Sequence, residues 1–220
     1  MNNGQWSAPP EDWRALCRRV FGEMSQAVQP GGDDSGGLLQ AALLLSALDR
    51  HCGEQPDPAD LRRLVALARV AIRTSRLEGS FVECADEPGA TGRILYDYLR
   101  FEFSGHVFYR YKLAPAQSDQ TGNTRCGRAM ILSQIRDVQV LRVLAPTRIA
   151  FACLDLRNDA DEAEALDILF ARLEKGGVIA VDHRGRERSI ASLVNSRPGL
   201  RLRRPNLIDL PCGLGLIMRR

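Results

Sequence analysis

The sequence predicts a three-layer α/β domain built on a mostly parallel sheet. Two continuous apolar runs, at residues 149–154 and 178–181, are typical of strands buried on both faces, and an aspartate follows each. A helical pattern between them fits the right-handed crossover that links parallel strands. Because parallel strands end at one edge of a sheet, Asp155 and Asp182 are expected at the same crevice.

Length and charge indicate one globular domain without a specialised surface. The chain has 220 residues and a formal net charge of +3, and its basic residues are spread out except at 184–204. We interpret that stretch as a solvated face, and expect no nucleic-acid partner. No basic start followed by an apolar block and no apolar run of membrane-spanning length occurs, so we expect a cytoplasmic protein without a membrane partner.

The six cysteines form no C-x-x-C motif and do not cluster with histidines in the sequence. We therefore expect them to be reduced. Cys84 and Cys153 lie in apolar strand patterns, where a thiol is usually a small core residue.

An N-terminal helical cap is expected before the sheet. Residues 1–9 are predicted to form a disordered tail, residues 10–76 a cap, and residues 77–220 the sheet domain, packed with the cap as one compact unit. The cap's predicted helices span 10–28, 38–52 and 58–74, with a Gly-rich mobile loop at 31–37. Asp57 and Pro58 give the third helix its start signal. The apolar helices suggest a homodimer.

The sheet domain is expected to contain five strands and a closing pair. The strands are predicted at 80–84, 106–113, 138–143, 149–155 and 178–182. Additional helices are expected near 93–100, 130–135 and 190–194. A polar loop is expected at 114–125, between the first and the second of these helices. Segments 200–203 and 214–219 are predicted to close the sheet as an antiparallel pair.

Four sequence segments carry a family resemblance. They are F-V-E-C with the following glycine (81–89), I-A-F-A-C-L-D (149–155), A-L-D-I-L-F-A-R-L-E-K-G-G-V-I-A-V-D-H (165–183) and L-P-C-G-L-G-L-I-M-R (210–219). Over residues 65–220 the chain resembles the macrocin and mycinamicin O-methyltransferases. The resemblance implies a Rossmann-like class I methyltransferase sheet with an antiparallel C-terminal strand. It also implies S-adenosylmethionine as cofactor and a small-molecule or sugar hydroxyl as acceptor in natural-product biosynthesis.

The resemblance also implies a magnesium ion at the ends of the fourth and fifth strands. Asp155 and Asp182 match two of the family's acids, and His183 stands where a further acid is usual. These three residues are the candidate metal ligands and the candidate catalytic residues. Magnesium prefers oxygen ligands and, when bound to a hydroxyl, favours its deprotonation.

The cofactor site implied by the resemblance is lined by Glu83, Ala85, Gly89 and Tyr111. The sequence departs from the family pattern in several places: Ala85 replaces a glycine, and the second strand carries Arg110 and Lys112 without a carboxylate. Arg157 replaces an acid after the fourth strand.

Other interpretations stay open. The chain could be a degenerate methyltransferase fold without cofactor that acts as a partner subunit or scaffold. It could also perform acid/base cyclisation or elimination with Asp182 and His183, the latter as a general base. The acidic run of Asp159, Asp161, Glu162 and Glu164 is most simply a helix N-terminus.

Overall fold

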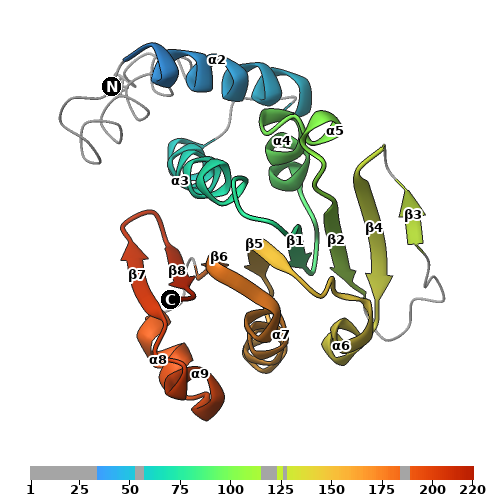
Figure 1. The fold of residues 1–220 in the computed structure, drawn as a ribbon, viewed down its shortest axis with the longest axis vertical. Coiled ribbons are helices and arrows are strands. Elements are labelled where there is room, and N and C mark those ends of the chain that lie inside the picture. Colours follow the sequence, from blue (N-terminus) through green and yellow to red (C-terminus); the bar gives the residue numbers. More distant parts are fainter. Residues whose placement is uncertain (1–33, 53–56, 115–122, 126–127, 184–188) are drawn as a thin grey trace, which may run out of the picture.

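The computed structural model of the chain describes residues 34–52, 57–114, 123–125, 128–183 and 189–220. It has an α/β fold in which one sheet lies between two helical layers (Figure 1). The predicted tail at 1–9 and the predicted helix at 10–28 lie outside the described residues.

The described elements alternate between helix and strand along most of the chain. The helices are α2 (Asp34–His51), α3 (Pro58–Thr74), α4 (Ala90–Tyr98), α5 (Phe101–Ser104), η1 (Val138–Val140), α6 (Leu141–Leu144), α7 (Asp159–Arg172), α8 (Ile190–Asn195) and α9 (Pro198–Leu202). The strands are β1 (Ser80–Ala85), β2 (Phe108–Leu113), β3 (Asn123–Arg125), β4 (Met130–Ile135), β5 (Ile149–Asp155), β6 (Leu173–Asp182), β7 (Asn206–Leu210) and β8 (Leu214–Met218).

The eight strands form one sheet in the order β3-β4-β2-β1-β5-β6-β8-β7. Neighbours from β4 to β6 pair in parallel, whereas β8 runs antiparallel to both β6 and β7. The order reverses between β1 and β5, so ligands are expected beyond the carboxyl ends of these two strands. The predicted three-layer, mostly parallel fold with an antiparallel C-terminal strand is therefore confirmed.

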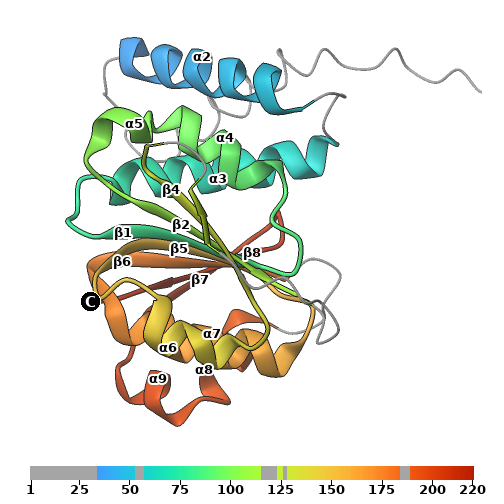
Figure 2. The same ribbon diagram turned by 90° about the vertical axis from the view of Figure 1, so that its right-hand side faces the viewer.

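The two helical layers cover opposite faces of the sheet. Helices α2 to α5 lie on one side and α6 to α9 on the other (Figure 2). Each layer closes its own apolar core: Phe81 and Phe151 face the first, Val82 and Ala152 the second. This alternation explains why β1 and β5 read as continuous apolar runs, since both of their faces are buried.

Side-chain caps begin two of the helices that flank the sheet, α3 and α7. The side chain of Asp57 accepts a hydrogen bond from the Ala59 N–H at 2.6 Å, which starts α3 as the sequence predicts. Asn158 caps α7 in the same way, and Asp159, Asp161 and Glu162 occupy its first turn. These three acids of the run therefore lie at a helix N-terminus, as predicted, whereas Glu164 lies after the first turn and contacts Arg142 and Arg197.

Three segment predictions were wrong. Residues 130–135 form the strand β4, and the predicted strand at 138–143 is instead η1 with most of α6. Asp137 decides the second case, because its side chain accepts from the Gln139 N–H at 2.8 Å and caps a helical turn. Residues 200–202 belong to α9, so the strand that pairs with β8 in the closing hairpin is β7 at Asn206–Leu210.

Smaller corrections concern element boundaries. Residues 34–37 of the predicted loop are helical, and β3 lies within a segment predicted as a loop. Strand β6 begins at Leu173, before the predicted start at residue 178, and its pairing with β5 shifts register between Ile149 and Phe151.

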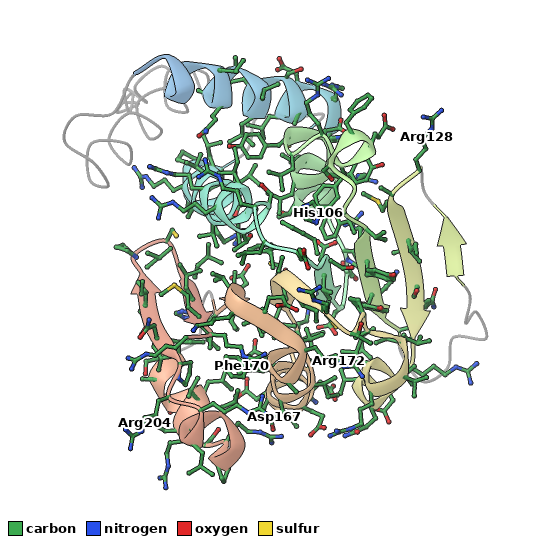
Figure 3. All side chains as sticks on the ribbon, viewed as in Figure 1. His106, Arg128, Asp167, Phe170, Arg172 and Arg204 are labelled. Carbon is green, nitrogen blue, oxygen red and sulfur yellow. The ribbon has the colours of Figure 1, made fainter. Side chains whose placement is uncertain are left out.

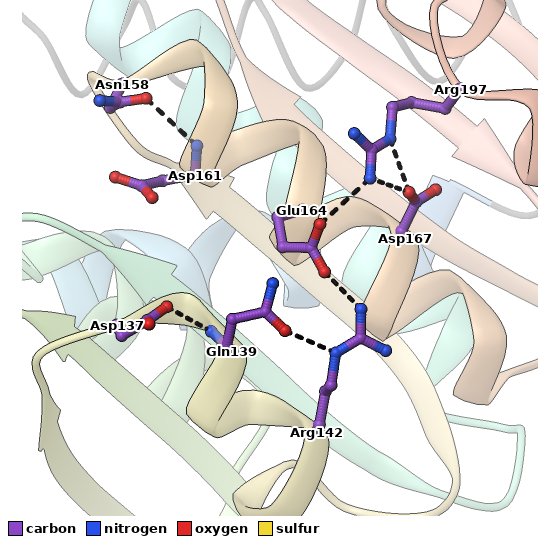
Figure 4. Close-up of polar contacts among 8 residues, drawn as sticks. All are labelled: Asp137, Gln139, Arg142, Asn158, Asp161, Glu164, Asp167 and Arg197. Atoms are coloured by element: carbon purple, nitrogen blue, oxygen red, sulfur yellow. Dashed lines mark hydrogen bonds and ion pairs between the residues drawn. The ribbon is translucent and has the colours of Figure 1, made fainter.

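A polar network joins α7 to its neighbours in the second helical layer (Figure 4). Arg142 donates to Glu164 at 2.5 Å and to Gln139 at 2.6 Å, which ties α7 to η1 and α6. Arg197 donates to Asp167 at 2.5 Å and to Glu164 at 3.2 Å, which ties α7 to α8 and α9. The layer is thus fixed by charge as well as by its apolar core.

On the opposite side of the sheet, His106 joins β2 to the end of α3 (Figure 3). Its ring nitrogens lie 2.8 Å from the Gly79 carbonyl and 2.9 Å from the Ser75 carbonyl.

Among the described helices, none is long and apolar enough to span a membrane.

Candidate functional site

The carboxyl edge of the sheet brings the predicted acids to one side of the molecule. Ala85 at the end of β1 pairs in register with Asp155 at the end of β5, and Asp182 ends the adjacent strand β6. Asp155 is exposed, whereas Asp182 is buried. The loop after β1 is tied to the loop after β5, because Asp86 accepts from the Arg157 N–H at 2.7 Å.

Glu83, a predicted cofactor residue, is closed off by an arginine of the neighbouring strand. Arg110 of β2 lies opposite it in register, and its Nε donates to the Glu83 carboxylate. Both side chains are only 6% exposed. Burial raises the pKa of Glu83, while Arg110 and the Gly92 N–H oppose this rise.

The same arginine holds the loop between β1 and α4. Arg110 also donates to the Gly89 carbonyl at 2.8 Å, so one guanidinium joins β1, β2 and this loop. A Cβ at Gly92 would lie 2.5 Å from a Glu83 oxygen and 2.6 Å from Arg110 Nε, which explains the glycine there. At Gly89 an added Cβ would meet nothing within 4 Å.

Asp182 is paired with the helical layer above the sheet. Its carboxylate lies 3.1 Å from Nη1 of Arg63, which belongs to α3. The side chains are 8% and 11% exposed. Nη2 of the same arginine lies 3.2 Å from Asp60 one turn earlier in α3.

His183 follows Asp182 and faces the closing hairpin rather than Asp155. Its backbone N–H donates to the Gly213 carbonyl at 3.1 Å, and its ring Nε2 lies 3.4 Å from the Asp209 carboxylate. This Nε2 is buried and makes no well-aligned hydrogen bond within the described part of the chain. A buried imidazole nitrogen beside a carboxylate is chemically suited to proton transfer.

Tyr111 lies apart from this edge. It faces the second core, and its hydroxyl donates to the Leu144 carbonyl at 2.7 Å. Burial also raises its pKa. The structure therefore places Tyr111 between β2 and α6, away from Glu83 and Gly89, which belong to the opposite face.

The described cysteines show no site of their own. Cys52, Cys84, Cys153 and Cys212 are free thiols, and burial raises the pKa of each. Cys84 and Cys153 are core residues, as predicted. Cys17 and Cys126 lie outside the described residues.

The predicted magnesium ligands do not form a metal cage in this arrangement. Within the described ranges, no three His, Cys, Asp or Glu side chains are grouped so that they could hold a metal ion. Asp182 already contacts a guanidinium, and His183 is turned toward Asp209. These side chains therefore do not fit a magnesium ion as they stand.

The loop after β1 fits one end of S-adenosylmethionine better than the other. The N-cap of α4 is Gly89, which has open space at its Cα and no side-chain cap, so the first N–H groups of the helix suit a carboxylate. The ribose end fits less well, because β2 carries Arg110 and Lys112 and no carboxylate that could accept hydrogen bonds from the ribose hydroxyls.

Sequence reasoning missed the two arginines that define this edge. Arg110 enters the sequence prediction only as a residue of a strand that lacks the expected carboxylate. A charged residue within a predicted buried strand is, however, a signal of a buried partner. Arg63 gave no such signal, because an arginine in an amphipathic helix is usually solvated. Its contact with Asp182 depends on how α3 lies on the sheet.

Comparisons with known proteins identify the fold. No protein-family model matches the chain, and no curated protein matches its sequence. Among solved structures, the O-methyltransferase NovP has a TM-score of 0.60 at 11% identity, covering 85% of this chain and 99% of that chain. The calicheamicin methyltransferase CalS11 has a TM-score of 0.56 at 13% identity, covering 99% and 98%.

A second structure of CalS11, without ligand, is described as a TDP-rhamnose 3'-O-methyltransferase of calicheamicin biosynthesis. It has a TM-score of 0.55 at 13% identity and covers 96% of each chain. At this identity the likeness establishes the class I methyltransferase fold and not the narrower macrocin-type family. The fold expected from the resemblance is thereby confirmed.

Proposed function

We propose that this chain is an O-methyltransferase that uses S-adenosylmethionine to methylate a hydroxyl of a sugar or another small molecule. The observation that carries the proposal is the fold likeness to NovP and CalS11 over nearly the whole of each chain. Both are named as methyltransferases, and CalS11 acts in the biosynthesis of a natural product. A natural-product pathway, and the macrocin-type family, are therefore part of the proposal.

The arrangement of the sheet edge supports this assignment. When bound, the cofactor supplies a methyl group on a sulfonium, and its transfer to an oxygen is an in-line displacement that depends on positioning. Gly89 and the N-terminus of α4 offer space and N–H donors for the cofactor's carboxylate. Asp155 and Asp182 are the last residues of β5 and β6, and His183 follows Asp182. An acceptor hydroxyl would have to be bound and deprotonated near this edge.

Calorimetric titration with S-adenosylmethionine and S-adenosylhomocysteine tests the proposal. We expect binding to the wild-type chain and weaker binding to Gly89→Ala, because an added methyl would obstruct the approach of the ligand to the backbone. Gly199→Ala is the matched control. An added Cβ at Gly199 would also meet nothing within 4 Å, but Gly199 lies in α9, outside the proposed cofactor loop. Equal affinity of all three proteins would contradict the assigned cofactor loop.

A second candidate is a non-methylating partner subunit on the same fold. The Glu83–Arg110 pair favours it, because this acid of the expected cofactor loop is already paired inside the protein. No heat and no thermal shift with either ligand would support this candidate over the first. Turnover of a substrate without cofactor would instead indicate acid/base chemistry at Asp182 and His183.

The assembly is also a proposal. We infer a homodimer, or a complex with a partner enzyme, from the apolar character of the N-terminal helices. Light scattering at several concentrations would test it, because a constant mass near the 24.4 kDa of one chain contradicts the homodimer.

A further inference from the structure

The most unusual feature of the sheet edge is a charge pair between Asp182 and the helix α3. Asp182 ends β6 with an almost fully buried carboxylate, which requires a counter-charge. In the methyltransferase interpretation this carboxylate would meet a divalent cation. In this chain it meets the guanidinium of Arg63, with Nη1 at 3.1 Å.

Arg63 is held in this position from two directions. Asp60 contacts its Nη2 at 3.2 Å from the preceding turn of α3. The helix itself is anchored, because Leu61, Leu64 and Leu67 are buried in the core that α3 shares with the sheet. The guanidinium is therefore positioned by the fold rather than chosen among many solvent-exposed conformations.

The Arg63–Asp182 pair lies next to the hairpin formed by β7 and β8. Asp182 pairs in register with Leu214, the first residue of β8, so the pair lies close to the turn between β7 and β8. The next residue, His183, lies beside Asp209 of that hairpin. A divalent ion at Asp182 would have to approach the fixed positive charge of Arg63, and like charges oppose each other strongly where water is excluded.

We propose that Arg63 is a permanent cation of this site, which occupies the place at Asp182 that a divalent metal ion would need. The site then works without a metal. This inference concerns the charge of the sheet edge and does not depend on whether the chain transfers methyl groups. It makes Arg63, a residue of the helical cap, a positioning residue of the site.

The guanidinium keeps a donor for a ligand. Nη1 of Arg63 is buried and makes no well-aligned hydrogen bond within the described residues, although it lies 3.1 Å from Asp182. An N–H group at this position can donate to an oxygen atom of an acceptor and orient it. Unlike a metal ion, a hydrogen-bond donor does not coordinate that oxygen as a Lewis acid, so the proton must be taken by a neighbouring base such as His183.

Thermal unfolding with added metal tests the inference. Wild-type protein and Asp182→Asn are titrated with MgCl₂ and MnCl₂ against KCl of matched ionic strength. We expect no saturable shift of Tm in either protein. A saturable rise in the wild type that Asp182→Asn abolishes would overturn the inference, whether or not the protein binds S-adenosylmethionine.

A variant that removes the cation provides the positive arm. Arg63→Met keeps most of the apolar stem but removes the guanidinium beside the buried Asp182 carboxylate, and should lower Tm by about 10 °C. It should also gain a rise of Tm with Mn²⁺ that the wild type lacks. An Arg63→Met protein as indifferent to Mn²⁺ as the wild type would overturn the claim that Arg63 takes the place of a metal.

The double variant decides the case in which Arg63→Met does not fold. Arg63→Met with Asp182→Asn removes both charges, so it should fold and be more stable than Arg63→Met alone. A double variant that is no more stable than Arg63→Met would show that the arginine does not compensate Asp182, which contradicts the proposal.

Discussion

The two halves of the sheet edge each bury one acid, and each acid is paired with an arginine from a different kind of element. Glu83 of β1 is paired with Arg110 of the adjacent strand β2. Asp182 of β6 is paired with Arg63, which comes from α3 above the sheet. The first pair is internal to the sheet, whereas the second connects the sheet to a separate layer.

This difference teaches where the edge can change. The Glu83–Arg110 pair also holds the loop before α4 and is fixed by strand register, so it is as rigid as the sheet. The pair of Asp182 persists only while α3 stays docked. We therefore expect the half around β1 to be the more sensitive to substitution and the half around β6 to be the more responsive to ligands.

Removing Arg110 should have the largest effect. Arg110→Met leaves Glu83 buried without its partner and should lower the free energy of unfolding by about 3–5 kcal/mol. Urea unfolding measures this loss. In the double variant with Glu83→Gln, most of it should be recovered, and a double variant as unstable as Arg110→Met would contradict the assigned pairing.

The pH dependence of Arg110→Met sharpens the same point. Burial raises the pKa of Glu83, and the variant lacks the guanidinium that opposes this rise. A raised pKa means that the folded state holds a proton that the unfolded state releases. Stability is therefore highest below the unfolded pKa and falls as pH rises toward the folded pKa. The gap between wild type and variant should widen from acid to neutral pH.

Gly92→Ala should have the next largest effect. Its Cβ would lie 2.5 Å from a Glu83 oxygen, so the buried pair must shift, at a cost of about 1–3 kcal/mol. Gly89→Ala at the start of the same helix is the matched control, because open space surrounds that position. Equal unfolding midpoints for the two variants would show that the pair does not limit Gly92.

Arg197→Met tests the polar network on the other face of the sheet. Its contacts with Asp167 and Glu164 are partly exposed, so the expected loss of stability is about 1 kcal/mol. Burial tends to raise the pKa of Glu164, but hydrogen bonds from Arg142, Gln139 and Arg197 lower it overall. This stabilisation is present at neutral pH and lost as pH falls through the folded pKa. The effect of Arg197→Met should therefore shrink in acid, which is the same direction as for Arg110→Met but from a smaller effect at neutral pH.

The smallest effect is expected at Arg148, which bridges Glu78 and Glu174 on the surface. It forms short contacts with both acids, as Arg110 does with Glu83, but its side chain is 53% exposed. Water and salt screen such pairs, so Arg148→Met should not change the unfolding midpoint measurably. A loss as large as that of Arg110→Met would mean that burial is not what separates the pairs.

The sequence predicted the fold wherever a local pattern and its burial agree. The apolar runs of β1 and β5 and the cap of α3 are of this kind. The errors fall where the two conflict: Met130–Ile135 alternates too weakly to distinguish strand from helix, and Val138–Val140 is apolar but begins with a capping aspartate. Tertiary contacts decide such segments.

The candidate site was predictable only in part. The positions of Asp155 and Asp182 follow from the rule that parallel strands end at one edge. The partners of the buried acids do not follow from sequence, because Arg63 and Asp182 are far apart in the chain and meet only through the docking of α3. The placement of Tyr111 under α6 likewise depends on strand parity.

The contacts at Gly92 also limit how this protein can evolve. Loss of Arg110 alone leaves the buried Glu83 without its guanidinium partner, and loss of Glu83 alone leaves the buried guanidinium without its carboxylate. A side chain at position 92 would displace both groups. Each single step passes through a destabilised form, so drift at one position selects for change at the others. Homologues should therefore keep or replace these three residues as a set, and an alignment would show them as one covarying group.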